Sequence, residues 1–211
     1  MLRRNGVDLS EFMKLPGKST VRRELGLEPK SRMVLFLGRL APVKGLEMLL
    51  RAFARLNLAE ARLVVAGPDQ GDGYKSRLMQ LVETLGLRDR VQFPGPIYGE
   101  RKVRLLADAD VVVLPSVYES FGNVAAEAVA AGTPVVVTKD CGIAPLIQDR
   151  VGLVTEHESS HFAEALNQML IGRELHQMFT DRCSHVAKEF TWDEPVMQME
   201  SLYRDLDNGG I

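Results

Sequence analysis

Two glutamates flank a glycine in the stretch PSVYESFGNVAAEAVAAGTP, which has the residue types of a ligand-binding loop followed by a helix. Gly122 would let a ligand approach the backbone closely, and the N–H groups of Gly122, Asn123 and Val124 would open the helix as an anion site. Glu127 lies about one turn into this helix, among alanines that offer it no cation. Beside a bound diphosphate, its carboxylate could accept two hydrogen bonds from ribose hydroxyls. Glu119, before the glycine, would face the other end of the ligand.

The alternative for these two glutamates is that both are solvated, which is the usual situation of acidic residues in a loop and a helix. The surroundings argue against it. An Ala-rich helix that follows the apolar run VVVLP and ends in Gly-Thr-Pro is typical of tight packing on a sheet. The amino end of such a helix points at the crevice where α/β proteins bind ligands.

Two cations follow another apolar run of the chain. After VLFLG come Arg39 and then Lys44, on a loop and at the start of a helical segment, where free backbone N–H groups also point. A guanidinium can grip two phosphate oxygens and an ammonium adds a point charge, each charge-assisted bond being worth roughly 1.5–3 kcal/mol. The alternative is that both cations are only exposed to solvent, which is usual for two cations in a surface loop. Because these follow a predicted core strand, they predict a polyphosphate pocket, although their spacing differs from the Walker loop and from GxGxxG.

Strand-like and helix-like segments alternate around these residues. Four short runs rich in β-branched residues predict parallel strands buried on both faces, at 34–37, 63–66, 111–115 and 135–138. Helical spacing predicts helices at 44–56, 74–86, 99–109, 123–132, 159–171, 173–189 and 193–206, and residues 207–211 should fray. This order predicts an α/β fold with a Rossmann-like, doubly wound parallel sheet that binds ligands beyond the carboxyl ends of its strands.

Length and composition narrow the possible partners. The chain has 211 residues, of which 45% are hydrophobic, enough for one substantial core with appendages. The formal net charge is -2 and the basic residues are dispersed among acidic ones, so we expect no nucleic-acid partner. No apolar run approaches the roughly 20 residues that span a bilayer, so we expect no membrane contact from this domain. Two cysteines far apart, Cys141 and Cys183, favour a reducing cytosol.

Two further patterns have the letters of a metal site without its setting. Asp108-Ala-Asp110 precedes a predicted core strand, which favours a structural role for both carboxylates. His157 and His161 have the spacing of metal ligands on a helix, but they lie in polar sequence before an amphipathic segment, so we expect them to be solvated. We therefore expect no metal and no cofactor other than the substrate itself.

These features resemble family 4 glycosyltransferases, whose hallmark is a Glu-x7-Glu motif, seen here from Glu119 to Glu127 with a Phe-Gly pair inside it. Other similar stretches are Gly38-Arg39-Leu40, Lys44-Gly45, Gly67-Pro68-Asp69, Val91–Gly95 and Ala131–Val135. The resemblance covers most of the chain. It implies the carboxyl-terminal, donor-binding half of a two-domain GT-B fold, retention of anomeric configuration, and no need for a divalent metal.

The resemblance also implies roles for individual residues. Arg39 and Lys44 would bind the diphosphate of a nucleotide-sugar donor, with Glu119 as the third catalytic residue, beside the transferred sugar. Glu127 would bind the ribose, and the base would rest near 93–97. The implied donor-binding set is Gly38, Arg39, Lys44, Pro94, Gly95, Ile97, Glu119, Phe121, Gly122, Asn123, Val124 and Glu127.

A domain organisation follows from the same resemblance. Residues 1–15 would be the remnant of an interdomain connector, 16–190 the nucleotide-sugar-binding domain, and 191–211 a helix that crosses to a missing amino-terminal, acceptor-binding domain. Aromatic anchoring of a terminal helix explains the last segment equally well. The enzyme would be cytoplasmic, with membrane association only through the missing domain. At Cys141–Pro145 the chain departs from many relatives, which carry a Gly-Gly-x-x-Glu loop there.

The leading hypothesis is transfer of a hexosyl group from a nucleoside-diphosphate sugar, with Arg39, Lys44 and the helix amino end stabilising charge on the leaving diphosphate. This domain alone would be inactive. The first alternative is a stand-alone nucleotide-sugar-binding module without turnover. A second is an NAD-dependent or epimerase-type Rossmann enzyme, which would carry a GxGxxG pattern after its first strand and a Tyr-x-x-x-Lys pair, and we expect neither here.

Overall fold

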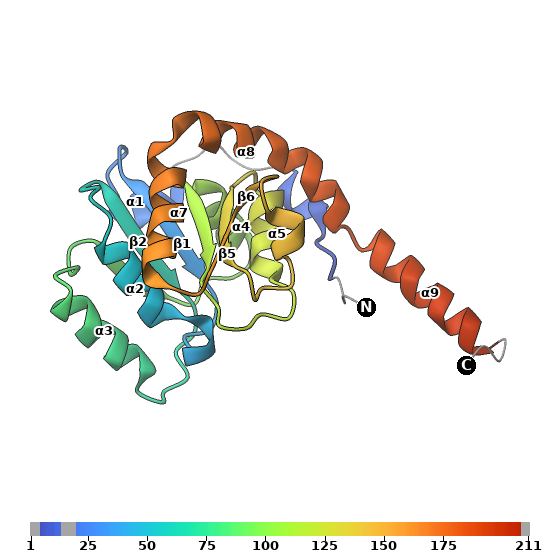
Figure 1. Ribbon diagram of the computed structural model, residues 1–211, viewed down its shortest axis with the longest axis horizontal. Helices are drawn as coiled ribbons and strands as arrows, with labels where there is room; N and C mark the ends of the chain where they lie inside the picture. The colour runs from blue at the N-terminus through green and yellow to red at the C-terminus, as the bar shows by residue number, and fades with distance from the viewer. Residues whose placement is uncertain (1–4, 14–19, 208–211) are drawn as a thin grey trace.

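Figure 1 shows a computed structural model of the chain, in which residues 5–13 and 20–207 are described. Within these residues, six strands form one sheet in the order β3-β2-β1-β4-β5-β6, and all neighbouring strands are parallel. The strands are β1 (Arg32–Leu37), β2 (Ala61–Ala66), β3 (Val91–Gly95), β4 (Val111–Leu114), β5 (Val135–Thr138) and β6 (Gly152–Thr155). Strand order reverses between β1 and β4, where such sheets open a crevice at their carboxyl ends. The predicted Rossmann-like, doubly wound sheet is confirmed.

Helices cover both faces of this sheet. One face carries α2 (Leu46–Ala54), α3 (Tyr74–Thr84) and α7 (Ser159–Ile171). The other carries α1 (Thr20–Glu24), α4 (Gly99–Asp108), α5 (Asn123–Ala130) and α6 (Ala144–Ile147). α8 (Arg173–Val186) adds side chains to both layers, and α9 (Asp193–Asp207) extends away from the domain (Figure 1). Short 3-10 turns are η1 (Leu9–Phe12), η2 (Pro42–Lys44) and η3 (Ala187–Phe190). None of the helices in the described part of the chain is long and apolar enough to cross a membrane.

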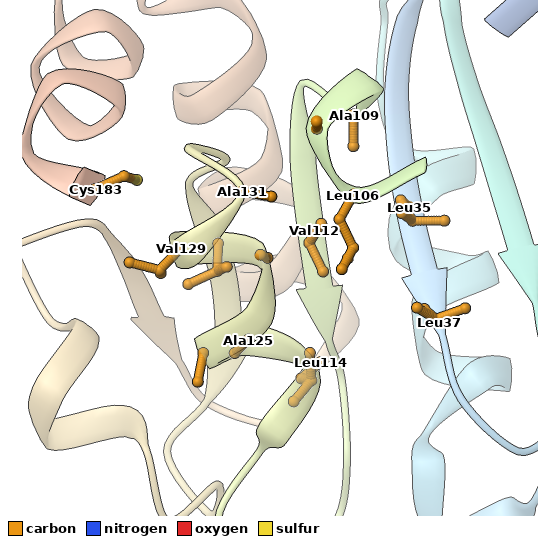
Figure 2. Packing of buried hydrophobic residues seen from close by; sticks show 14 of the residues in the cluster. Leu35, Leu37, Leu106, Ala109, Val112, Leu114, Ala125, Val129, Ala131 and Cys183 are labelled. Carbon is orange, nitrogen blue, oxygen red and sulfur yellow. The ribbon is translucent and has the colours of Figure 1, made fainter. Parts of the chain in front are cut away.

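The strands have continuous apolar runs because their side chains alternate between two hydrophobic clusters, one on each face. In β4, Val112 belongs to the cluster under α4 and α5, whereas Val113 belongs to the cluster under α2 and α7. Figure 2 shows the first cluster, with Leu106 of α4 and Val129 of α5 near β4. Alanines such as Ala125 are fully buried, so the backbone of α5 packs close to the sheet.

The four predicted strands are present, and two more were missed. β3 contains a proline and a glycine, and most side chains of β3 and β6 are only half-buried, so neither strand has a continuous buried run. The helix predicted at 44–56 begins later, because Gly45, with φ of 68°, separates η2 from α2. Asp207 was expected to fray but belongs to α9, and 208–211 lie outside the described residues.

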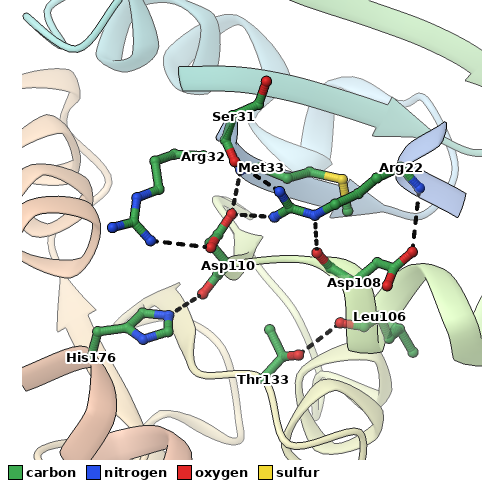
Figure 3. Close-up of polar contacts among 9 residues, drawn as sticks. All are labelled: Arg22, Ser31, Arg32, Met33, Leu106, Asp108, Asp110, Thr133 and His176. Carbon is green, nitrogen blue, oxygen red and sulfur yellow. Dashed lines mark hydrogen bonds and ion pairs between the residues drawn. The ribbon is translucent and has the colours of Figure 1, made fainter. Parts of the chain in front are cut away.

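At the amino ends of the central strands, two aspartates form hydrogen bonds and ion pairs with several elements (Figure 3). Asp110 pairs with Arg22 and Arg32, and it accepts the N–H of Met33 at 2.6 Å. Asp108 accepts two backbone N–H groups of α1 at 2.9 and 3.3 Å. Both carboxylates therefore hold α1 and β1 against the start of β4. The structural role predicted for Asp108-Ala-Asp110 is confirmed.

The first described residues of the chain lie beside the start of α5 and against the residue that precedes α9. Gly6 packs against the indole of Trp192, since a Cβ on Gly6 would lie 2.4 Å from a ring atom. The assignment of 1–15 to an interdomain connector and of the last helix to a domain crossing remain predictions. Residues 1–4 and 14–15 of that connector lie outside the described residues.

Candidate functional site

The candidate site lies at the carboxyl ends of β1 and β4, which are neighbours in the sheet. A cavity of about 200 Å³ opens there between the loop after β1 and the loop after β4. Predicted donor-site residues that line it are Gly38, Arg39, Lys44, Glu119, Gly122, Asn123 and Val124. The other lining residues come from the strand ends: Phe36, Leu37, Leu114 and Ser116, of which Leu37 and Leu114 are labelled in Figure 2. The fold thus brings the cationic loop and the acidic loop to one pocket.

Gly45 makes the contact between these two loops possible. Its φ of 68° lies in the left-handed region that favours glycine, and a Cβ there would lie only 1.9 Å from the carbonyl oxygen of Pro115. Beside it, the N–H of Val117 donates to the carbonyl oxygen of Val43 at 2.9 Å. Lys44 is therefore fixed next to the start of the acidic loop.

The other side of the acidic loop rests on the segment after β5. The N–H of Glu119 donates to the carbonyl oxygen of Asp140 at 3.2 Å, and the N–H of Gly142 donates to that of Glu119 at 2.9 Å. A Cβ on Gly142 would lie 2.2 Å from the carbonyl oxygen of Ser120, so the two backbones pack without space for a side chain. The stretch 141–145 therefore supports the acidic loop through its backbone.

The two cations of the pocket have different surroundings. The side chain of Lys44 is 20% exposed, and its Nζ lies 2.5 Å from Oε2 of Glu119. An ammonium has three N–H donors, so this contact leaves two for a ligand. Arg39 is exposed, and no residue in the described ranges forms an ion pair or hydrogen bond with its guanidinium. Glu119 therefore lies against one of the two cations of the pocket, and its place beside the transferred sugar stays a prediction.

Helix α5 begins at the pocket. Gly122 precedes it with φ of 109°, and the first N–H groups of the helix, on Asn123 and Val124, have no acceptor within the helix. The side-chain amide of Asn5 donates to Oδ1 of Asn123 at 3.0 Å. The positive end of the helix therefore faces the cavity beside Lys44, and the combination suits an anion.

Glu127 lies further along α5 and does not line the cavity. Its Oε1 accepts a hydrogen bond from Nζ of Lys102 at 2.9 Å, with the side chains 21% and 25% exposed. Its own helix offers Glu127 no cation, as the sequence indicated, and the partner comes from α4, which is remote in sequence. The expectation that the chain has no Tyr-x-x-x-Lys pair is wrong, because Tyr98 and Lys102 have this spacing; here, however, Tyr98 is 70% exposed and Lys102 is paired with Glu127.

Sequence reasoning missed two buried polar atoms at the site. Ser116 is 1% exposed and lines the cavity, yet its Oγ has no hydrogen-bond partner among the described residues. The Nε2 of His157 is also buried and unpartnered within the same part of the chain, although this histidine was expected to be solvated. It packs behind the cationic loop, 2.8 Å from where a Cβ on Gly45 would lie. Ser116 could have been predicted as a site residue, because it follows closely after the core strand β4. Nothing in the sequence around His157 indicates its position.

Five of the predicted binding residues do not line this cavity: Pro94, Gly95, Ile97, Phe121 and Glu127. Ile97 and Phe121 are 4% and 2% exposed and pack in the hydrophobic core, so their side chains support the neighbouring backbone. Pro94 and Gly95 end β3 at the edge of the sheet. The binding of a base near these residues stays a prediction.

Across the described residues, no group of three or more His, Cys, Asp or Glu side chains could hold a metal ion. The stretch HESSH has the letters of a helical zinc motif, but Glu158 is the N-cap of α7 and accepts from the N–H groups of Ser160 and His161. His157 therefore precedes the helix and does not share a helix face with His161.

Burial raises the pKa of the Cys141 thiol, which keeps it protonated and unreactive.

Comparison with known proteins finds similarity to glycosyltransferases in both sequence and fold. The family described as glycosyl transferases group 1 matches residues 17–184. A D-inositol 3-phosphate glycosyltransferase of Salinispora arenicola (strain CNS-205) is 34% identical over an alignment of 213 residues. The alignment covers 94% of this chain and 48% of the relative. The chain spans about half the length of the curated relatives it matches.

Solved structures show the same fold over nearly the whole chain. Sucrose-phosphate synthase from Thermosynechococcus elongatus is 30% identical with a TM-score of 0.82, over 97% of this chain and 52% of that one. Anabaena Alr3699/HepE, in complex with UDP and glucose, is 26% identical with a TM-score of 0.86, over 95% of this chain and 55% of that one. The shared part is therefore about half of each of these larger structures.

Proposed function

Because the chain belongs to the glycosyl transferases group 1 family, we propose that it binds a nucleoside-diphosphate sugar as the donor half of a retaining enzyme that transfers a hexosyl group to an acceptor. The observation that carries this proposal is the meeting of Arg39, Lys44 and the amino end of α5 around one cavity of about 200 Å³. Three groups of positive potential around one space suit a diphosphate. The complex of the Anabaena relative with UDP supports a nucleotide ligand.

Each group in the pocket has a role in this proposal. Lys44 and Arg39 hold the diphosphate, Lys44 from a fixed position and Arg39 from the exposed rim. Glu119, kept in place by Lys44, accepts a hydrogen bond from a hydroxyl of the sugar. Glu127 accepts hydrogen bonds from the ribose, and the base rests near the end of β3.

Catalysis by these groups is electrostatic. Negative charge develops on the diphosphate as its bond to the anomeric carbon of the sugar breaks. Arg39, Lys44 and the N–H groups of α5 stabilise that charge more strongly in the transition state than in the ground state. Because the protein supplies these positive charges itself, we propose that donor binding needs no divalent metal and no further cofactor.

Transfer also needs an acceptor, and we propose that a second, acceptor-binding domain holds it. An acceptor hydroxyl must lie within about 3–3.5 Å of the anomeric carbon, and this alignment can supply ~7–11 kcal/mol of the barrier. A second domain would also exclude water, which otherwise screens the cations. Support comes from the relatives, of which this chain covers about half.

A binding screen followed by a transfer assay tests the proposal. The 211-residue chain is titrated by calorimetry with UDP-, GDP- and ADP-sugars, and the best donor is then incubated with candidate acceptors, with and without an acceptor-binding domain restored upstream. We expect measurable donor binding by the chain alone, at most slow donor hydrolysis, and glycosyl transfer only with the second domain.

Other outcomes of this screen separate the alternatives. If the chain binds no nucleotide sugar, the donor role is wrong. Donor binding without transfer in the two-domain form would favour a stand-alone nucleotide-sugar-binding module. Multiple turnovers of transfer by the chain alone would contradict the need for a second domain.

A further inference from the structure

We propose that Lys102 is a positioning residue for donor binding: it holds the carboxylate of Glu127 in place and offsets its charge beside the bound diphosphate. This inference rests on the proposed function, in which Glu127 binds the ribose. The ion pair between the two side chains, 2.9 Å from Nζ to Oε1, carries it.

Lys102 lies where two parts of the proposed site adjoin. It is in the first turn of α4, which begins at Gly99 directly after the segment 93–97 proposed to hold the base. Glu127 is on α5, which packs beside α4 and opens at the diphosphate pocket. The ion pair therefore connects α4, which follows the segment proposed to hold the base, with α5, which follows the acidic loop.

The pair leaves Glu127 able to bind a ligand. A carboxylate has two oxygens and about four lone-pair sites, and Lys102 occupies only one of them, on Oε1. No residue in the described ranges donates to Oε2, so this oxygen and the free lone pair of Oε1 remain for two neighbouring hydroxyls. A carboxylate without a cation would also repel a diphosphate bound at the amino end of the same helix.

An incidental surface ion pair is the alternative, and most such pairs contribute little to stability. Two observations favour a specific role. The pair is mostly covered, with side chains 25% and 21% exposed. The other two cations of α4 have acids elsewhere, since Arg101 pairs with Glu24 of α1 and Arg104 with Glu100 of its own helix. Of the cations on α4, it is Lys102 that reaches α5.

The test compares nucleotides that differ only at the ribose. Calorimetry measures the affinity of the chain for UDP, GDP and ADP and for their 2′-deoxy counterparts. We expect Lys102→Met to weaken binding of the preferred ribonucleotide by about 10-fold while weakening the deoxynucleotide less, because one charge-assisted contact stops orienting the ribose acceptor. Lys102→Arg keeps the charge and should retain most of the affinity.

Two further variants separate positioning from a general structural effect. In a Glu127→Gln background, Lys102→Met should change affinity by less than about 2-fold, since its target is already neutral. Arg101→Met is the matched control, because it breaks a more exposed pair on the same helix and should leave both nucleotides unchanged. Thermal melts of each variant show whether the protein is folded at the titration temperature.

The outcomes divide clearly. Equal losses for the ribonucleotide and its deoxy counterpart in Lys102→Met, or wild-type binding of both, would overturn the role of Lys102 while leaving the proposed function standing. The same loss in the Glu127→Gln background as in the wild type would also overturn it. If the wild-type chain binds none of the nucleotides, the proposed function fails and this inference fails with it.

Discussion

Lys44→Met should weaken nucleoside-diphosphate binding more than Arg39→Met does, although both remove one positive charge from the same cavity. Arg39 is exposed and makes no ion pair with a described residue, so its loss removes only its own contact with the phosphates. Lys44 lies 2.5 Å from Glu119, and both side chains are at most 20% exposed. Removing Lys44 therefore also leaves an uncompensated carboxylate facing the diphosphate.

The expected size of the effect follows from these contacts. One charge-assisted hydrogen bond is worth roughly 1.5–3 kcal/mol, which corresponds to about 10- to 150-fold in affinity. Arg39→Met should fall in this range, and its loss should be largest at low ionic strength, where an exposed charge is least screened. Lys44→Met should lose more than Arg39→Met, because repulsion by Glu119 adds to the missing bond. Glu119→Gln added to Lys44→Met should recover part of that additional loss.

Calorimetric titration with the preferred nucleoside diphosphate compares these three variants with the wild type at low and moderate salt. Lys188→Met serves as a control, because this lysine is exposed in η3 and does not line the cavity. The reasoning is refuted if Lys44→Met binds as well as Arg39→Met, or if Glu119→Gln weakens binding further in the Lys44→Met background. Either result would mean that Glu119 does not oppose the diphosphate when its lysine is absent.

Ser116→Ala removes a hydroxyl that has no partner among the described residues, so urea unfolding should be unchanged while calorimetry shows about 2- to 10-fold weaker nucleotide binding; equal affinity would exclude contact with the ligand. Asp110→Ala leaves neighbouring arginines unpaired and should lower the free energy of unfolding by about 3–5 kcal/mol without changing nucleotide affinity, and an unchanged urea midpoint would contradict its structural role. Hydrogen bonds from Ser160 lower the pKa of Glu158 from 4.5 to about 2, so its stabilisation is present above pH 4.5 and is lost as the pH falls towards 2. Glu158→Ala should therefore flatten the loss of stability over that pH range, and a curve parallel to the wild type would argue against the cap. EDTA should leave nucleotide affinity unchanged, whereas strict dependence on magnesium or manganese would contradict the metal-free pocket.

The core strands were predictable for a simple reason. A parallel strand that is covered on both faces is apolar at nearly every position, so β1, β2, β4 and β5 are visible as short runs rich in Val and Leu. The two edge strands do not have this property. β3 ends in a proline and a glycine, and β6 has a neighbouring strand on one side only and mostly half-buried side chains, so neither shows the run that sequence reasoning needs.

The pocket itself was predictable in part. Its cationic loop and the Gly122 turn each follow a recognisable core strand, and parallel strands bring their carboxyl ends to one edge of the sheet. The contacts between the loops were not predictable. The pairing of Lys44 with Glu119, and the support of Glu119 by the segment after β5, depend on which strands are neighbours and on how closely two glycine-containing backbones approach.

The α/β class, the four buried strands and the two loops that carry the chemistry could be predicted from the order of residues, because burial and chain conformation leave local patterns. Which charges meet depends on how the chain folds. Lys44 contacts Glu119, and Lys102 contacts Glu127, across loops and helices that are far apart along the chain. An ion pair depends on the distance between two side chains in space. Strand order and helix packing set that distance, and the residues between the two partners give no local pattern from which it could be predicted.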